Sequence, residues 1–410
     1  MPDLEAILLA RIDRAWAVGW QPRELVRHVR RTTSALATQL VALATRADHA
    51  VRVDQAIDAR WVEQVAELGA RTMSTRDGWL SRWSEHYSRD DLTVGRAVGA
   101  VLELLTRLPV LDVLIPPPGS PPASRVRGLP VDSPGDDPVL RRVRKLLAKA
   151  ESTSDEHEAD SLTAKAHELM TKHAIDQALV DGPEPSDLPC TVRVPIDAPY
   201  VDAKSLLLQV IAEGQRCRAI FHPRLDLSSV IGHAGDLRAV ELVFTSLLVQ
   251  AQHALAARAG AAGGHTRTRS YRAAFYVSFA RRIGERLAAV TATVLAEVDD
   301  GEHLPVLQAR EVAVVAAFDE RYGESLTSTA IRGGHDALGH AHGRQAADAA
   351  VRVRCDHDVG APCGPPRTYP QIANPYYRKG SERRRLLACL GTRSHPGPRP
   401  PGRSAPSRAR

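Results

Sequence analysis

The chain has 410 residues, of which 43% are hydrophobic and 25% charged, a balance that is ordinary for a folded protein and excludes a low-complexity or collagen-like chain. Its net charge of +6 comes from one end, because residues 361–410 contain 11 Lys and Arg and one acid, Glu382. These residues carry +10 and the other 360 sum to −4, so the net charge is no evidence that the body of the protein binds nucleic acid.

Cysteine content and hydropathy indicate in which cellular compartment the protein is expected. The five cysteines are scattered and odd in number, which predicts no disulfide framework. No apolar run reaches the roughly 20 residues that span a bilayer, and Asp3 and Glu5 precede the first apolar run, unlike in a secretory signal. We therefore expect a cytoplasmic protein with no membrane contact.

The first 114 residues show the spacing of apolar residues that helices need. Pro22 opens a segment in which hydrophobic side chains recur every three or four residues, and Ala-rich segments of the same kind follow. We predict a helical N-terminal domain over 1–114. Residues 115–137 are rich in Pro, Gly and Ser and predict an extended linker.

Residues 138–176 predict a helical hairpin. Asp137 can cap the first helix, and Pro138 suits its first position. The pair Thr153 and Glu156 has the spacing of a capping box at the start of a second helix. Apolar stripes on the two helices would pack together; they consist of Val139, Leu140, Val143, Leu146, Leu147 and Ala150, and of Ala159, Leu162, Ala166, Leu169 and Met170.

On these residues the hairpin resembles a bacterial and phage family known as domain of unknown function 2786. The family pattern falls on residues 143–150, on Glu158 and Ala159, and on 164–170. Its positions here include Leu146, Leu147, Glu158, Ala159, Ala166, Leu169 and Met170. Residues 202–353 are similar, more weakly, to the region that follows the hairpin in such proteins. The resemblance implies a fold and no reaction.

The remaining chain predicts a linker, a mixed domain and a tail. Residues 177–201 are rich in proline and read as a second linker. An α+β domain follows over 202–358, with strands at 216–222 and 227–231 forming a small hairpin against long helices; those helices are expected at 203–213, 237–258, 271–298, 308–321 and 335–351. Residues 359–410 predict a disordered basic tail. The expected fold class is mostly α, and α+β overall.

Two basic segments are candidates for nucleic-acid contact. Between 265 and 287, Arg267, Arg269, Arg272 and Arg281 alternate with aromatic residues, a mixture suited to phosphate contact and base stacking. The same aromatics step by four, however, which also fits a core stripe with solvated arginines.

The second basic segment is the first helix of the hairpin. Arg141, Arg144, Lys145 and Lys149 lie opposite its apolar stripe and could follow a phosphate backbone. A solvated helix side explains them as well, and Glu158 nearby would oppose an anion.

Catalytic signatures are weak. His335, His340 and His342 could ligate a metal, but their spacing places them on different helix faces, so we expect no metal and no cofactor. No nucleophile triad, dinucleotide fingerprint or P-loop is present. We therefore favour a non-enzymatic binding protein with a nucleic acid or a protein as its partner. A metal-dependent hydrolase using the three histidines and a helical scaffold are the alternatives, and the oligomeric state is open.

Overall fold

The structure is a computed structural model, and it describes residues 2–52, 54–68, 78–86, 90–120, 138–153, 156–181, 188–261, 263–297, 303–323, 331 and 334–350. These residues all belong to one compact unit, Met1–Arg354. Asp137, most of the first predicted linker and the predicted tail lie outside them. The side chains of residues 154–157 also lie outside the described part, and the predicted capping box, which needs Glu156, lies outside it as well.

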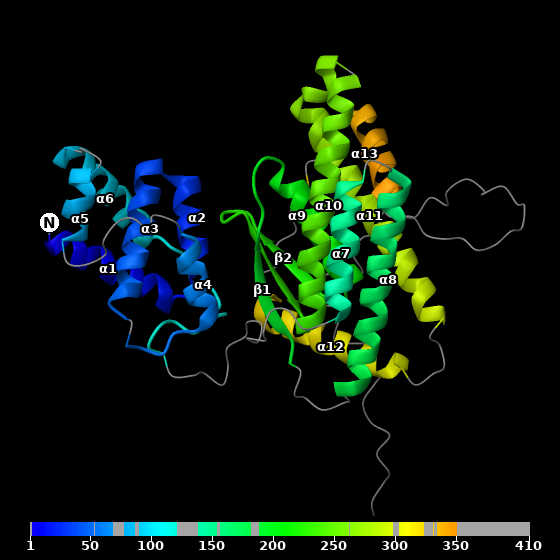
Figure 1. Cartoon of the computed structure of the whole chain (residues 1–410), viewed down its shortest axis with the longest axis horizontal. Helices are drawn as coiled ribbons and strands as arrows, with labels where there is room; N and C mark the ends of the chain where they lie inside the picture. The colour runs from blue at the N-terminus through cyan, green and yellow to red at the C-terminus, as the bar shows by residue number, and fades with distance from the viewer. Residues whose placement is uncertain are drawn as a thin grey trace, which may run out of the picture. The chain divides into compact units, whose positions relative to one another are not determined.

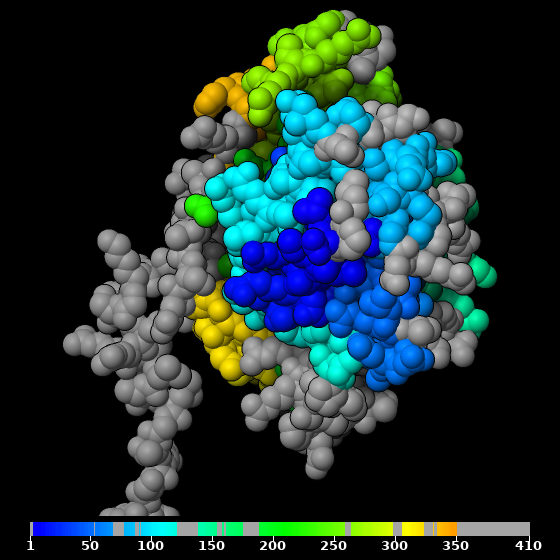
Figure 2. Space-filling view, turned by 90° about the vertical axis from the view of Figure 1, so that its left-hand side faces the viewer, coloured from blue at the N-terminus to red at the C-terminus, as the bar shows by residue number. Residues whose placement is uncertain are grey.

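Six helices form the N-terminal half of this unit. They are α1 (Pro2–Ala17), α2 (Pro22–Thr32), α3 (Ala35–Ala50), α4 (Ala59–Glu67), α5 (Trp79–His86) and α6 (Asp91–Thr106). In Figure 2, α1 (dark blue) lies at the surface of this half, next to the cyan residues of α5 and α6.

Tryptophans fill the core of the N-terminal helices. All five Trp side chains are at most 2% exposed. The rings of Trp16 and Trp61 meet edge to face at 5.0 Å, and the indole N–H of Trp16 donates to Asp48. Because each aromatic side chain buries a large apolar area, a small bundle gains a substantial core from these residues.

The rest of the unit consists of helices and one small sheet. The helices are α7 (Pro138–Ser152), α8 (Glu156–Asp181), α9 (Val201–Gly214), α10 (Ala234–Ala261), α11 (Arg269–Glu297), α12 (His303–Tyr322) and α13 (Ala337–Ala350), with a 3-10 turn, η1, at Gly263–Arg267. The strands are β1 (Cys190–Pro195), β2 (Arg218–His222) and β3 (Leu227–Gly232). With thirteen helices and three strands in the described residues, the prediction of a mostly α fold with α+β character is confirmed.

The sheet is antiparallel with strand order β1-β3-β2, so it is larger than the predicted hairpin. The added strand, β1, lies inside residues 177–201, where we predicted only a linker. That prediction was wrong because prolines frame a short strand whose side chains alternate between its two faces. Val192 and Val194 point into the core, and Thr191 and Arg193 lie on the other face.

The hairpin shares a core with the domain that follows it. Val143, Leu147, Ala166 and Met170 belong to the same buried cluster as residues of α9, α10 and α11. Figure 1 shows α7, α8, α10 and α11 as upright neighbours, with α12 crossing below them toward the sheet. The predicted domain boundaries remain predictions, but the hairpin is packed against the helices that follow it and does not stand alone.

One described helix has the length and composition of a membrane span. It is the segment Ala234–Arg258 of α10, and 44% of its most apolar window is buried inside the protein. The core helix of a folded protein passes the same test.

Candidate nucleic-acid interface

One side of α7 is an exposed, positively charged face. We call Arg141, Arg142, Arg144 and Lys145 the α7 basic face; all four are exposed. At 100° per residue they span about 160° of the helix surface. Within the described residues none of them takes part in an ion pair, and no acidic residue occurs between 138 and 150. Among the described residues, no acidic side chain neutralises this face.

The opposite side of α7 fixes the helix in place. Leu140, Val143, Leu147 and Ala150 are buried, while Leu146 is half-buried. On α8, Ala159, Ala166 and Met170 are buried and Leu169 is half-buried. The family-pattern residues are therefore mostly packing residues.

The other lysines of the hairpin form ion pairs with acidic residues of α8. Lys149 lies 2.6 Å from Glu158, which also accepts a hydrogen bond from the Thr153 hydroxyl at 2.7 Å. These bonds lower the pKa of Glu158, Lys149 being the largest cause. Lys165 and Lys172 both pair with Glu168. Lys149, which we predicted as a phosphate contact, is thus partly neutralised.

A buried histidine joins the hairpin to the helices behind it. His167 of α8 is 1% exposed, and its Nδ1 accepts from the Gln215 amide at 2.9 Å. Its Nε2 lies 3.1 Å from the Thr291 hydroxyl of α11. Burial, with Arg216 nearby, lowers the pKa of His167 to about 4, so the ring is neutral at pH 7. Sequence reasoning missed this network because its members lie far apart in the chain.

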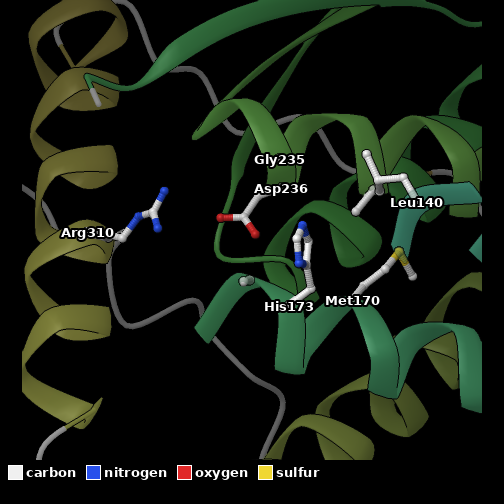
Figure 3. A pocket seen from close by; sticks show the side chains of 8 residues that line it. Leu140, Met170, His173, Gly235, Asp236 and Arg310 are labelled. Atoms are coloured by element: carbon white, nitrogen blue, oxygen red, sulfur yellow. The ribbon is translucent and has the colours of Figure 1, made fainter. Parts of the chain in front are cut away.

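A small cavity lies beneath the hairpin (Figure 3). It has a volume of about 10 Å³, room for about one water molecule. Leu140, Met170 and His173 line it, and the Asp236 carboxylate and Arg310 guanidinium point toward one another across it. Asp236 is also paired with Arg216 at 3.0 Å, so this carboxylate serves to hold α10 near the sheet.

The arginines near the start of α11 do not form one surface. Arg267, Arg269 and Arg281 are exposed, whereas Arg272 is half-buried and donates to the Thr266 carbonyl. Arg272 and Arg281 are nine residues apart, so they face opposite sides of the helix.

The aromatic residues of the same segment are not available to bases. Tyr271, Phe275 and Phe279 are 0% exposed, and Tyr276 is 5% exposed. The base-stacking hypothesis for residues 265–287 is therefore wrong, and the alternative of a core stripe is correct. A step of four residues places these rings on the side of α11 that packs against α9 and α13.

Two of the three predicted histidines near α13 form hydrogen bonds with neighbouring groups of the protein. His340 Nε2 lies 2.8 Å from the Gly334 carbonyl, and His342 Nδ1 lies 2.7 Å from the Tyr271 hydroxyl, while His335 is exposed. Asp336 accepts from the Gly339 N–H and pairs with His265. In the part of the chain that the structure describes, no group of three or more His, Cys, Asp or Glu could hold a metal ion.

Comparison with known proteins supports the hairpin resemblance alone. The model of a family described as "Protein of unknown function (DUF2786)" matches residues 139–177, which correspond to α7 and most of α8. The resemblance predicted from the sequence is thereby confirmed over these residues, and that of residues 202–353 stays a prediction. No curated protein and no solved structure matches the chain.

Proposed function

We propose that this protein binds nucleic acid and that the α7 basic face contacts the phosphate backbone. The observation that carries the proposal is the set of exposed cations at 141, 142, 144 and 145, which have no ion pairs among the described residues. Cations without internal partners can displace the counterions condensed on the phosphates, and this release is the main source of non-specific affinity.

The geometry of α7 suits a backbone contact. From Arg141 to Lys145 the helix rises about 6 Å, comparable to the spacing of about two phosphates along one strand. Its buried side packs against the core, so the helix backbone loses little conformational freedom on binding. Phosphate contacts carry no base information, and we therefore expect affinity with little sequence preference.

A salt series on the full chain tests the proposal. The variant R141Q/R144Q/K145Q removes three charges from α7, and R11Q/R14Q/R96Q removes three exposed charges from α1 and α6 as a control. Because the wild type and both variants keep the basic tail, its contribution to the salt slope is the same in all three proteins. For duplex DNA the log–log salt slope should fall by about 0.9 per lost contact, about 2 to 3 in all, in the α7 variant alone. Equal slopes in all three proteins would refute the proposal.

A further inference from the structure

A second candidate site lies on the outer face of the sheet, far in sequence from α7. An open cavity of about 510 Å³ is lined by the sheet, the end of α12 and the extended segment that follows α6. Its volume is within the range of sites for small molecules.

The alternation of the strands explains why the floor of this cavity is polar. Ser229 of β3 lies opposite Arg193 of β1, so the two side chains share the outer face of the sheet. Their neighbours Val192 and Val230 point into the core. The outer face is nevertheless covered, because Ser229 is only 3% exposed.

Four polar groups on this floor form a chain of hydrogen bonds. The Tyr322 hydroxyl donates to Asp112 Oδ2 over a long 3.4 Å and also bonds the side chain of Ser229. The Ser229 hydroxyl lies 2.9 Å from His222 Nε2. This series of hydrogen bonds therefore runs from the exposed carboxylate of Asp112 to the imidazole of His222.

The numbers of donors and acceptors on these four groups determine which group donates in each hydrogen bond. An ionised carboxylate only accepts, so the single proton of Tyr322 points to Asp112. The phenol oxygen must then accept from Ser229, and Ser229 must accept from an Nε2–H of His222. A neutral ring protonated at Nε2 leaves Nδ1 as an acceptor, and this atom has no partner among the described residues.

The charges nearby decide which ligand this acceptor suits. Burial, and then the charge of Arg193, lower the pKa of His222 and outweigh the opposite effect of Asp112, which keeps the ring neutral at pH 7. Arg193 is paired with Glu24, and Asp112 balances the charge of Arg224 at the cavity, so the lining carries no net charge and suits an uncharged ligand. The apolar lining, which includes Val110, Leu111 and Leu225, suits the face of a flat ring.

We propose that this cavity binds a small uncharged heteroaromatic molecule with an N–H donor, of the nucleobase or nucleoside type. The N–H would donate to His222 Nδ1, with Asp112 as a second acceptor, and the ring would pack against Val110, Leu111 and Leu225. This inference goes beyond the proposed function, because it uses none of the residues of the α7 basic face.

Calorimetric titration of the full chain with adenosine, guanosine, cytidine and uridine tests the site. We expect at least one of them to bind with a dissociation constant below about 1 mM. A counterpart whose ring and exocyclic N–H groups are methylated should bind at least about tenfold more weakly, since a buried acceptor then lacks its donor. This comparison of ligands requires no change in the protein.

Variants locate the binding. His222→Phe keeps an aromatic ring and removes the acceptor, so it should lose at least about tenfold in affinity. His253→Phe, at an exposed position of α10, should bind as the wild type does. The α7 variant R141Q/R144Q/K145Q should also bind normally, which separates this inference from the proposed function. The site is refuted if no nucleoside binds at millimolar concentration, or if the methylated ligand or His222→Phe binds unchanged.

Discussion

His167 makes the stability of the fold depend on pH. Its pKa in the folded protein is about 4, against 6.5 for a free histidine, because the ring is buried. Between these values the unfolded chain binds more protons, so the free energy of unfolding should fall as the pH is lowered. From pH 7 to pH 5 we expect this residue to remove about 2 kcal/mol, measured by urea unfolding at each pH.

The variant His167→Gln isolates this effect. Gln can keep a hydrogen bond to Gln215 or Thr291 and does not titrate. Other buried groups change protonation in both proteins, so only the difference between the two stability curves reports His167. That difference should change by about 2 kcal/mol between pH 7 and pH 5. Parallel curves would show that the ring is not held neutral.

At the scale of elements, local patterns predicted the helices well. The apolar residues of α11 and of the two hairpin stripes recur every three or four positions, and apart from Leu162 they lie in or against the core. Strand β1 was missed because its flanking prolines resemble those of a linker. The polar groups of the sheet cavity were missed because Asp112, His222 and Tyr322 converge only after folding, and no motif spacing links them.

The contact between α11 and α13 depends on two glycines. A Cβ at Gly339 would lie 2.5 Å from the Tyr271 carbonyl oxygen, and one at Gly343 would meet the backbone of Phe275. Because backbone atoms cannot move aside cheaply, Gly343→Ala should force the helices apart. We expect a loss of about 1–3 kcal/mol in the free energy of unfolding, measured by chemical denaturation.

Gly99→Ala provides the matched control for this helix contact. Gly99 lies in α6, and a Cβ at this position would have no packing neighbour within 4 Å among the described residues, so alanine there meets open space. Alanine should instead stabilise the helix by about 0.5–1 kcal/mol, because it loses less backbone entropy on folding. Opposite signs for the same substitution would confirm close packing of α13, whereas two stabilising effects would contradict it.

At the scale of the whole unit, one buried ion pair ties the N-terminal helices to the sheet. Arg193 of β1 bonds Glu24 of α2 at 2.7 Å and the carbonyls of Gly19 and Asp112 at 2.7 and 3.0 Å. Its side chain is 3% exposed. Burial raises the pKa of Glu24, and Arg193 only partly offsets this effect. The ionised form of Glu24 therefore depends on the positive charge of Arg193.

Removal of one partner should therefore cost more than removal of both. Arg193→Met leaves the Glu24 carboxyl buried without a counter-charge, and we expect it to lower the free energy of unfolding by about 3–5 kcal/mol. In the double variant Glu24→Gln with Arg193→Met no charge is left unpaired, so part of that loss should be recovered. Chemical denaturation of the wild type, both single variants and the double variant gives the coupling energy.

The exposed pair Arg23 and Glu67 is the control for this cycle. Its side chains are 53% and 48% exposed, so Arg23→Met should cost less than about 1 kcal/mol. If Arg193→Met cost no more than Arg23→Met, the buried pair would not join the two halves energetically. A large coupling energy would instead show that this ion pair helps to hold the N-terminal helices against the sheet. Because the Arg193 guanidinium also donates to the Asp112 carbonyl, the same side chain would hold the segment after α6 over the sheet cavity.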